Sequence, residues 1–317
     1  MITLKNGTLR LIVNPLGGGI ARFSRERCGK VTDFIYGYSS EEEKVGSMGD
    51  VLFPFPGRVK NCQYSFAGQD YTLSGLRIKD GHANHGFAKQ AEWKVVGSAP
   101  TTGSVGVPTG SVGKRRSDEE VELEFEMRAE DYRNKGFPFS LRLTLTYTLN
   151  SDGFVCRAEV VNLGNTNAPF GLGFHPYFQV GQVNDSKLKL PAQRMVEFAN
   201  LEPTGKLLPV AEAPFDTSGQ EEIGNIEVDN CFTGLKFENG HAETILSRGN
   251  NKIKIWQDQS FPYLQIYSAD TLSGPYKRKA IAIEPQTCTG FALNHPEMGL
   301  ITLNPDEMFE ASWGVSI

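Results

Sequence analysis

The stretch SLRLTLTYTLNSDGFVCRAEVVN, residues 140–162, decides the fold class. Apolar residues alternate with polar ones over 140–149, which is the period of a β-strand with one buried face. The next four residues, Asn150-Ser151-Asp152-Gly153, have the chemistry of a hairpin turn. Residues 154–162 then form a second strand-like segment, so the stretch predicts an antiparallel hairpin.

The same period-two pattern recurs on both sides of this hairpin, and long helical periods are almost absent. Short strands are predicted at residues 8–14, 20–23, 63–66, 69–73, 93–96, 121–128, 187–197, 235–237, 242–247, 252–256, 262–267, 280–285 and 309–315. Residues 51–59 predict an irregular, packed loop, because two prolines exclude a central strand. Residues 202–205 predict a turn, residues 209–226 an irregular region, and residues 98–117 a long flexible connection.

Many short strands without intervening helices predict an all-β fold, a large antiparallel sandwich or barrel. No convincing domain boundary interrupts the strands, so residues 1–317 are predicted to form a single domain.

The bulk composition excludes several function classes. The net charge is -5, and the densest cationic run, at 114–116, is followed at once by acids, which favours a solvated loop over a nucleic-acid site. The five cysteines are scattered without a Cys-x-x-Cys pair, which fits a reducing compartment. The first residues already read as a strand, and no apolar stretch approaches the roughly 20 residues of a membrane span. We therefore expect a cytoplasmic protein with neither a nucleic-acid nor a membrane partner.

The segment FGLGFHPYF, residues 170–178, sets a histidine between aromatic residues. Pro176 holds the residue before it in extended geometry, so His175 is predicted to be fixed at a strand end in an apolar wall. From this segment alone, a hydrogen-bonded core histidine and a ligand-facing histidine are equally good interpretations.

Three further residues sit in similar frames of proline, glycine or aromatic residues: Arg58, His85 and Glu284. Asp229, in Val228-Asp229-Asn230, is a fifth candidate. Arg58 also suits a surface cation, His85 a loop hydrogen bond, and Asp229 a turn cap. Glu284 is harder to explain in that way, because an apolar strand delivers it and a buried, unpaired carboxylate is costly.

A histidine and a glutamate with ordinary pKa values suit acid–base chemistry near neutral pH. The sequence lacks a Gly-x-Ser-x-Gly elbow, a phosphate loop before a helix and a His-Glu-x-x-His motif. A metal site formed by His82, His85 and a carboxylate has only weak support from its spacing, and we predict none.

Taken together, these segments resemble the aldose 1-epimerases, or galactose mutarotases, over nearly the whole chain. The resemblance is carried, in order, by Pro56-Gly57-Arg58-Val59, Asn84-His85-Gly86-Phe87, Phe174-His175-Pro176-Tyr177-Phe178, Val228-Asp229-Asn230-Cys231-Phe232 and Ile283-Glu284-Pro285-Gln286-Thr287. It implies the galactose mutarotase-like β-supersandwich with an open sugar cleft and no cofactor.

By the same resemblance, His175 is the general acid and Glu284 the general base of an isomerase. Arg58, His85 and Asp229 are the implied sugar-binding residues. The implied reaction interconverts the α and β anomers of a free aldohexose, such as glucose or galactose, through ring opening. Aromatic residues near His175 are expected to stack on the sugar.

One loop departs from the family pattern. The usual Leu-His-Gly-Gly is replaced by Asn84-His85-Gly86-Phe87-Ala88, which is similar to the hexose-6-phosphate 1-epimerase branch. Cations that could serve a phosphate are Arg58, Lys60, Arg77 and Lys79. A phosphorylated substrate and a non-catalytic carbohydrate-binding protein therefore remain as alternatives.

Overall fold

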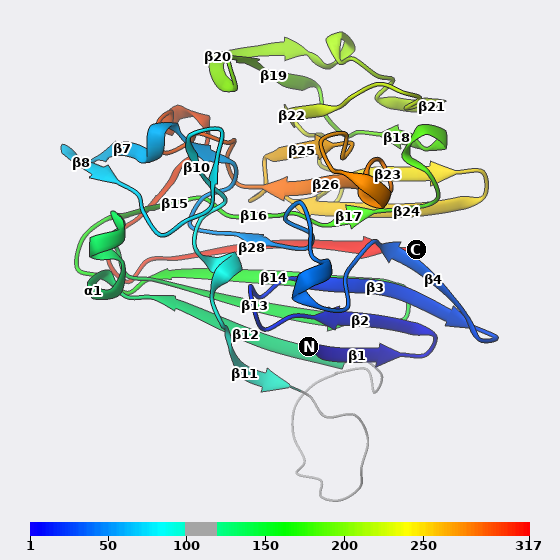
Figure 1. The fold of residues 1–317 in the computed structure, drawn as a ribbon, viewed down its shortest axis with the longest axis horizontal. Coiled ribbons are helices and arrows are strands. Elements are labelled where there is room, and N and C mark those ends of the chain that lie inside the picture. Colours follow the sequence, from blue (N-terminus) through cyan, green and yellow to red (C-terminus); the bar gives the residue numbers. More distant parts are fainter. Residues whose placement is uncertain (99–118) are drawn as a thin grey trace, which may run out of the picture.

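The computed structural model describes residues 1–98 and 119–317. The expected connection at 98–117 falls almost entirely outside the described residues. The predicted all-β antiparallel fold is confirmed: two large antiparallel sheets contain most of the strands (Figure 1).

The first large sheet has twelve strands, and β26 lies near its middle. Its main path runs β1 (Ile2–Asn6), β2 (Leu9–Val13), β3 (Ile20–Arg27), β4 (Lys30–Ile35), β17 (Tyr177–Phe178), β26 (Ile281–Gln286), β25 (Tyr263–Tyr267), β22 (Asp229–Thr233), β19 (Arg194–Ala199) and β20 (Glu202–Pro209). Two short strands lie off this path, β16 (Gly173–Phe174) against β26 and β5 (Val51–Leu52) against β16.

The second large sheet has nine strands. Their order is β11 (Lys94–Ser98), β12 (Glu119–Met127), β13 (Leu141–Leu149), β14 (Gly153–Asn162), β28 (Met308–Ser316), β24 (Asn251–Asp258), β23 (His241–Arg248), β18 (Lys187–Lys189) and β21 (Ser218–Glu222). The small sheets are β6 (Arg58–Val59), β10 (His82–Asn84) and β9 (Ile78–Lys79); β15 (Ala168–Phe170) with β27 (Ile301–Leu303); and β7 (Gln63–Phe66) with β8 (Gln69–Thr72).

The helices are single turns. They are α1 (Ala129–Tyr132) and the 3-10 turns η1 (Glu41–Glu43), η2 (Lys60–Cys62), η3 (Ala88–Gln90), η4 (Arg133–Lys135), η5 (Val183–Asp185), η6 (Val210–Glu212), η7 (Gly274–Tyr276) and η8 (Pro296–Met298).

The hairpin predicted from residues 140–162 is formed by β13 and β14, paired from Leu141 opposite Asn162 to Leu149 opposite Phe154. Every second residue of β13 is buried, as the alternation requires. One hydrophobic cluster includes side chains from both large sheets, so the two sheets share a core.

Side chains of strand β26 point alternately into this core and to the opposite face of the twelve-stranded sheet. Successive side chains of a strand point to opposite faces. Ile281 and Ile283 therefore enter the core, while Ala282, Glu284 and Gln286 face the other way. The sequence predicted Glu284 at the end of its strand. Glu284 instead lies inside β26, because pairing with β25 and β16 continues to Gln286.

Several local predictions were wrong. Residues 187–197 are not one strand: Pro191 interrupts the segment, and the chain passes from β18 in one large sheet to β19 in the other. The turn expected at 202–205 is the start of β20, whose position at the sheet edge tolerates Pro203. The actual turn is at Asn200 and Leu201, which both have positive φ.

Two more segments differ for similar reasons. The region 209–226 contains η6 and β21, a polar edge strand whose side chains are mostly exposed, so it lacks apolar alternation. Residues 235–237 form no strand; the N–H of Lys236 instead donates to the carbonyl of Pro191. In the 51–59 segment, the strands β5 and β6 flank the predicted irregular loop.

Candidate functional site

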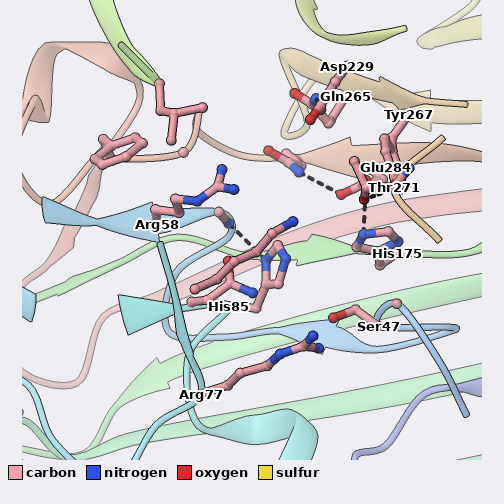
Figure 2. Close-up of a pocket in the computed structure, with 18 of the residues that line it drawn as sticks. Ser47, Arg58, Arg77, His85, His175, Asp229, Gln265, Tyr267, Thr271 and Glu284 are labelled. Atoms are coloured by element: carbon pink, nitrogen blue, oxygen red, sulfur yellow. Dashed lines mark hydrogen bonds and ion pairs between the residues drawn. The ribbon is translucent and has the colours of Figure 1, made fainter. Parts of the chain in front are cut away.

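A cavity of about 510 Å³ lies between the outer face of the twelve-stranded sheet and the small β6–β10–β9 sheet. All five residues predicted from the sequence line it: Arg58, His85, His175, Asp229 and Glu284. Figure 2 shows them converging from separate elements, with Arg58 and His85 on one side and Glu284 and Asp229 on the other.

The outer face of the large sheet supplies a row of polar side chains, since residues opposite each other on antiparallel strands share a face. Asp229 on β22 is opposite Tyr267 on β25, and Gln265 on β25 is opposite Glu284 on β26. Gln286 follows two residues after Glu284 and lies on the same face. The strand register, and not closeness in sequence, brings the carboxylates into one cavity.

His175 and Glu284 form the closest pair of ionisable groups in the cavity. The distance from His175 Nε2 to Glu284 Oε1 is 3.3 Å, and their side chains are 8% and 3% exposed. The amide of Gln286 donates to the other carboxylate oxygen, Oε2, at 3.0 Å. One oxygen of Glu284 is thus oriented by a neighbouring amide, and the other faces the imidazole (Figure 2).

His175 lies between β16 and β17, with its backbone fixed on both sides. Its N–H donates to the carbonyl of Asp50, and its own carbonyl accepts from the N–H of Gly49. Tyr177 stacks on the imidazole, with ring centroids 5.0 Å apart, and its hydroxyl donates to the carbonyl of Gly46. In the described parts of the chain, Nδ1 of His175 is buried without a hydrogen-bond partner.

The expectation of ordinary pKa values for this pair was wrong. Burial, together with the charge of Lys89, lowers the pKa of His175 to about 3. Burial, together with the charge of Asp229, raises the pKa of Glu284 well above its usual value. Both shifts have the same main cause, because a site with little water disfavours the ionised form of any group.

His85 is held in a defined tautomer. Its Nδ1 accepts a hydrogen bond from the N–H of Gly57 at 3.1 Å, and burial lowers its pKa well below the ordinary histidine value. A neutral imidazole that accepts at Nδ1 carries its proton on Nε2. The His85 and His175 ring centroids are 5.6 Å apart, so His85 presents an N–H donor beside the His175–Glu284 pair.

Two glycines allow this placement. Gly86 has a φ of +67°, and a Cβ there would lie 2.1 Å from the carbonyl oxygen of Phe53. Gly57 has a φ of +62°, and its Cβ would lie 2.4 Å from the Cα of Gly290. Both residues need glycine for conformation and for space, so His85 and Arg58 each adjoin a position that only glycine can occupy.

The remaining predicted residues are anchored by side-chain contacts. Arg58 Nη2 lies 3.1 Å from Asp80 Oδ2, and its Nε is buried without a partner among the described residues. Asp229 accepts a hydrogen bond from Gln265 Nε2 at 2.7 Å. The cavity therefore combines fixed donors and fixed acceptors, the usual requirement for binding a polyhydroxylated molecule.

The sequence patterns did not identify Gln265, Gln286, Tyr177 or Asn84 as site residues, although each lines the cavity. Gln265 was a detectable signal, because it is a polar residue in the otherwise apolar segment Pro262-Tyr263-Leu264-Gln265-Ile266-Tyr267. Gln286 was detectable by its two-residue spacing from Glu284. The role of Tyr177 depends on tertiary stacking that no local pattern reveals.

His82 and His85 are held separately, since His82 Nδ1 accepts from the N–H of Asn61. Within residues 1–98 and 119–317, no group of three His, Cys, Asp or Glu side chains could hold a metal ion. None of the helices in this part of the chain has the length and apolarity needed to cross a membrane.

Comparison with known proteins assigns the chain to a family. The family model for aldose 1-epimerases matches residues 1–316. The chain belongs to the aldose 1-epimerase family. Among curated relatives of this aldose 1-epimerase family member, the uncharacterized protein YihR of Escherichia coli K12 is 25% identical over 299 residues, covering 92% of this chain and 85% of YihR.

Solved structures of aldose epimerase relatives share the fold. The GalM/aldose epimerase homologue from C. elegans superposes with a TM-score of 0.82 at 21% identity, covering 99% of this chain and 97% of that one. The galactose 1-epimerase from Lactobacillus acidophilus NCFM gives 0.77 at 19% identity, covering 99% and 92%. The predicted galactose mutarotase-like sandwich is confirmed.

Proposed function

We propose that this member of the family is an active aldose 1-epimerase that interconverts the α and β anomers of an aldohexose by general acid–base catalysis. The observation that carries the proposal is the buried His175–Glu284 pair, 3.3 Å apart in a cavity lined by polar side chains. The exchange of anomers requires one group that accepts a proton and one that donates a proton.

The proposed steps balance in protons. Glu284 takes the proton of the C1 hydroxyl while His175 donates a proton to the ring oxygen, and the bond between C1 and the ring oxygen breaks. C1 becomes an aldehyde carbon, and rotation about the C1–C2 bond presents its other face. The ring oxygen then attacks C1, and both protons return to their original sites.

The pair must hold one proton in total for this cycle. Ring opening starts from the state with this proton on His175. Burial favours the proton on Glu284, so we propose that it first passes from Glu284 to His175 across their 3.3 Å contact, which keeps the net charge of the pair at zero. Burial disfavours the positively charged imidazolium form of His175, and it also disfavours the negatively charged carboxylate form of Glu284. The same burial that shifts both pKa values therefore widens the pH range of the one-proton state.

The other residues are proposed to orient the sugar. His85 Nε2–H and the Arg58 guanidinium would donate to ring or hydroxyl oxygens. Asp229, held by Gln265, would accept from hydroxyl groups. Fixed partners of this kind lower the entropic cost of placing C1 between His175 and Glu284.

Anomer exchange measured by NMR on equilibrated glucose and galactose tests this proposal, with polarimetry of freshly dissolved α-anomers as the second readout. We expect exchange well above the buffer rate and its loss in His175→Asn. If calorimetry shows sugar binding while exchange stays at the buffer rate, the protein is a carbohydrate-binding protein and not an enzyme.

A further inference from the structure

The small β6–β10–β9 sheet presents one uniform face to the cavity. In its register, Asn84 is opposite Arg58 and His82 is opposite Lys79. Because His82 and Asn84 are two residues apart on β10, all four side chains lie on the same face. Arg77 joins them, since it precedes Lys79 by two residues and its carbonyl accepts from the N–H of Asn84.

This face is strongly cationic. Arg58, Arg77 and Lys79 all line the cavity. Arg58 is paired with Asp80, and the charges of Asp229 and Asp80 also act on Lys79. In the described parts of the chain, however, no acidic side chain forms an ion pair within 4.0 Å of Arg77 or Lys79, so the cations outnumber the acids they face. The chain as a whole has a net charge of -5, so three cations on one face of this cavity are not a reflection of its composition.

Arg77 and Lys79 are exposed to solvent and near the reacting pair. Both lower the pKa of His175, which shows that their charge reaches the imidazole. Figure 2 shows Arg77 below His85 with its guanidinium directed toward the loop that carries Ser47, on the side of the cavity away from Glu284. A sugar with C1 at Glu284 would extend its far end toward this cationic face.

A neutral sugar needs hydrogen-bond donors and acceptors but no excess of cationic charge. A guanidinium beside an ammonium instead suits the oxygens of a phosphate, sulfonate or carboxylate, which accept charge-assisted hydrogen bonds. We propose that Arg77 and Lys79 bind an anionic substituent at the exocyclic end of the sugar, so that the preferred substrates are acidic aldoses. This assignment of substrate class rests on the proposed function.

Binding is tested with ligands that cannot mutarotate. 1,5-Anhydroglucitol lacks the anomeric hydroxyl, and its 6-phosphate adds only the anion. Calorimetry at low salt should show the phosphate binding on the order of tenfold tighter or more, as expected for charged hydrogen bonds. This advantage should shrink as salt is raised.

Arg77→Gln and Lys79→Gln should each lower the ratio of the two affinities, phosphate over neutral, by about tenfold. Lys94→Gln is the matched control, because Lys94 is an exposed cation on β11 that does not line the cavity. It should leave the ratio unchanged. Equal affinity for the two ligands, or an equal effect of all three substitutions, would overturn the proposal.

Anomer exchange then distinguishes the possible anions. Glucose 6-phosphate, the 6-sulfonate of glucose and glucuronate are each compared with glucose, every rate being corrected for its own buffer reaction. Faster enzymatic turnover of at least one acidic sugar is expected, and preference for glucose over all three refutes the assignment. If the phosphate ligand binds tightly but no sugar is turned over, the ligand class stands and the proposed catalysis fails.

Discussion

Replacing Glu284 by Gln is the sharpest test of the proposed chemistry. The amide has almost the same shape as the carboxylate, and its oxygen can still accept from Gln286, which now donates to Glu284 at 3.0 Å. The substitution therefore removes the proton acceptor without opening a cavity. General base catalysis is worth roughly 10²–10⁴-fold, so anomer exchange should fall by that factor, or about 3–5 kcal/mol in the barrier.

The same change has a second, independent consequence for stability. The folded-state pKa of Glu284 is raised, so the folded protein holds this proton more tightly than the unfolded chain does. Its favourable contribution is complete below the ordinary glutamate pKa and is lost as pH rises through the folded-state pKa. Every tenfold difference in proton affinity between the folded and unfolded states corresponds to about 1.4 kcal/mol of stability. The free energy of unfolding of Glu284→Gln, measured relative to that of the wild type, should therefore be higher at pH 8 than at pH 4.

Exchange NMR gives the rate, and urea unfolding at pH 4 and pH 8 gives the stability. Circular dichroism verifies that the variant is folded, and Glu222→Gln, at an exposed position on β21, is the control. Activity within tenfold of the wild type would refute the role of Glu284 as the base. A variant that is folded and inactive but relatively less stable at pH 8 would refute the assignment of a burial-raised pKa.

Three further outcomes are expected. The imidazole of His175 should stay neutral in ¹⁵N NMR from pH 8 to about pH 4 and titrate near its folded-state pKa of about 3; titration near pH 6.5 would contradict this. Gly86→Ala should lower the free energy of unfolding by more than about 1 kcal/mol and lower activity, because Gly86 has a positive φ and its Cβ would clash with the Phe53 carbonyl. Gly68→Ala is the control: Gly68 has a φ of +77° with open space around it, so this variant measures the cost of the backbone conformation without a clash. Gln265→Leu should weaken sugar binding about fivefold through loss of its hydrogen bond to Asp229, while the turnover of bound sugar persists; calorimetry and saturation kinetics separate the two effects.

The sequence predicted what depends on local patterns. Alternation over 140–162 indicated the central hairpin. Local frames of glycine, proline or aromatic residues indicated four of the five cavity residues, and the family resemblance added the role of Asp229. It failed where tertiary position overrides local preference. Pro203 suggested a turn but lies in an edge strand, and residues 187–197 alternate well but are divided between two sheets at Pro191.

The electrostatics of the site could not be read from residue types. A histidine and a glutamate have ordinary pKa values until they are buried, and the depth of burial is set by β16, β17 and β26 packing together. The cationic face was only partly visible, because Arg77, Lys79 and Arg58 come together through strand pairing. Strand register, which short motifs do not encode, decides both properties.

The cavity is lined by the large twelve-stranded sheet and by the small three-stranded β6–β10–β9 sheet. This difference in size affects which substitutions the protein can tolerate. In β26, Ile281 and Ile283 belong to the shared core, so inserting or deleting one residue would exchange the core and cavity faces. The strands β9 and β10 are short and lie outside both large sheets. We therefore expect substitutions there to be tolerated more easily than substitutions in β26. Under the proposed mechanism, a few changes in this three-stranded sheet would alter the accepted sugar while the His175–Glu284 pair is kept.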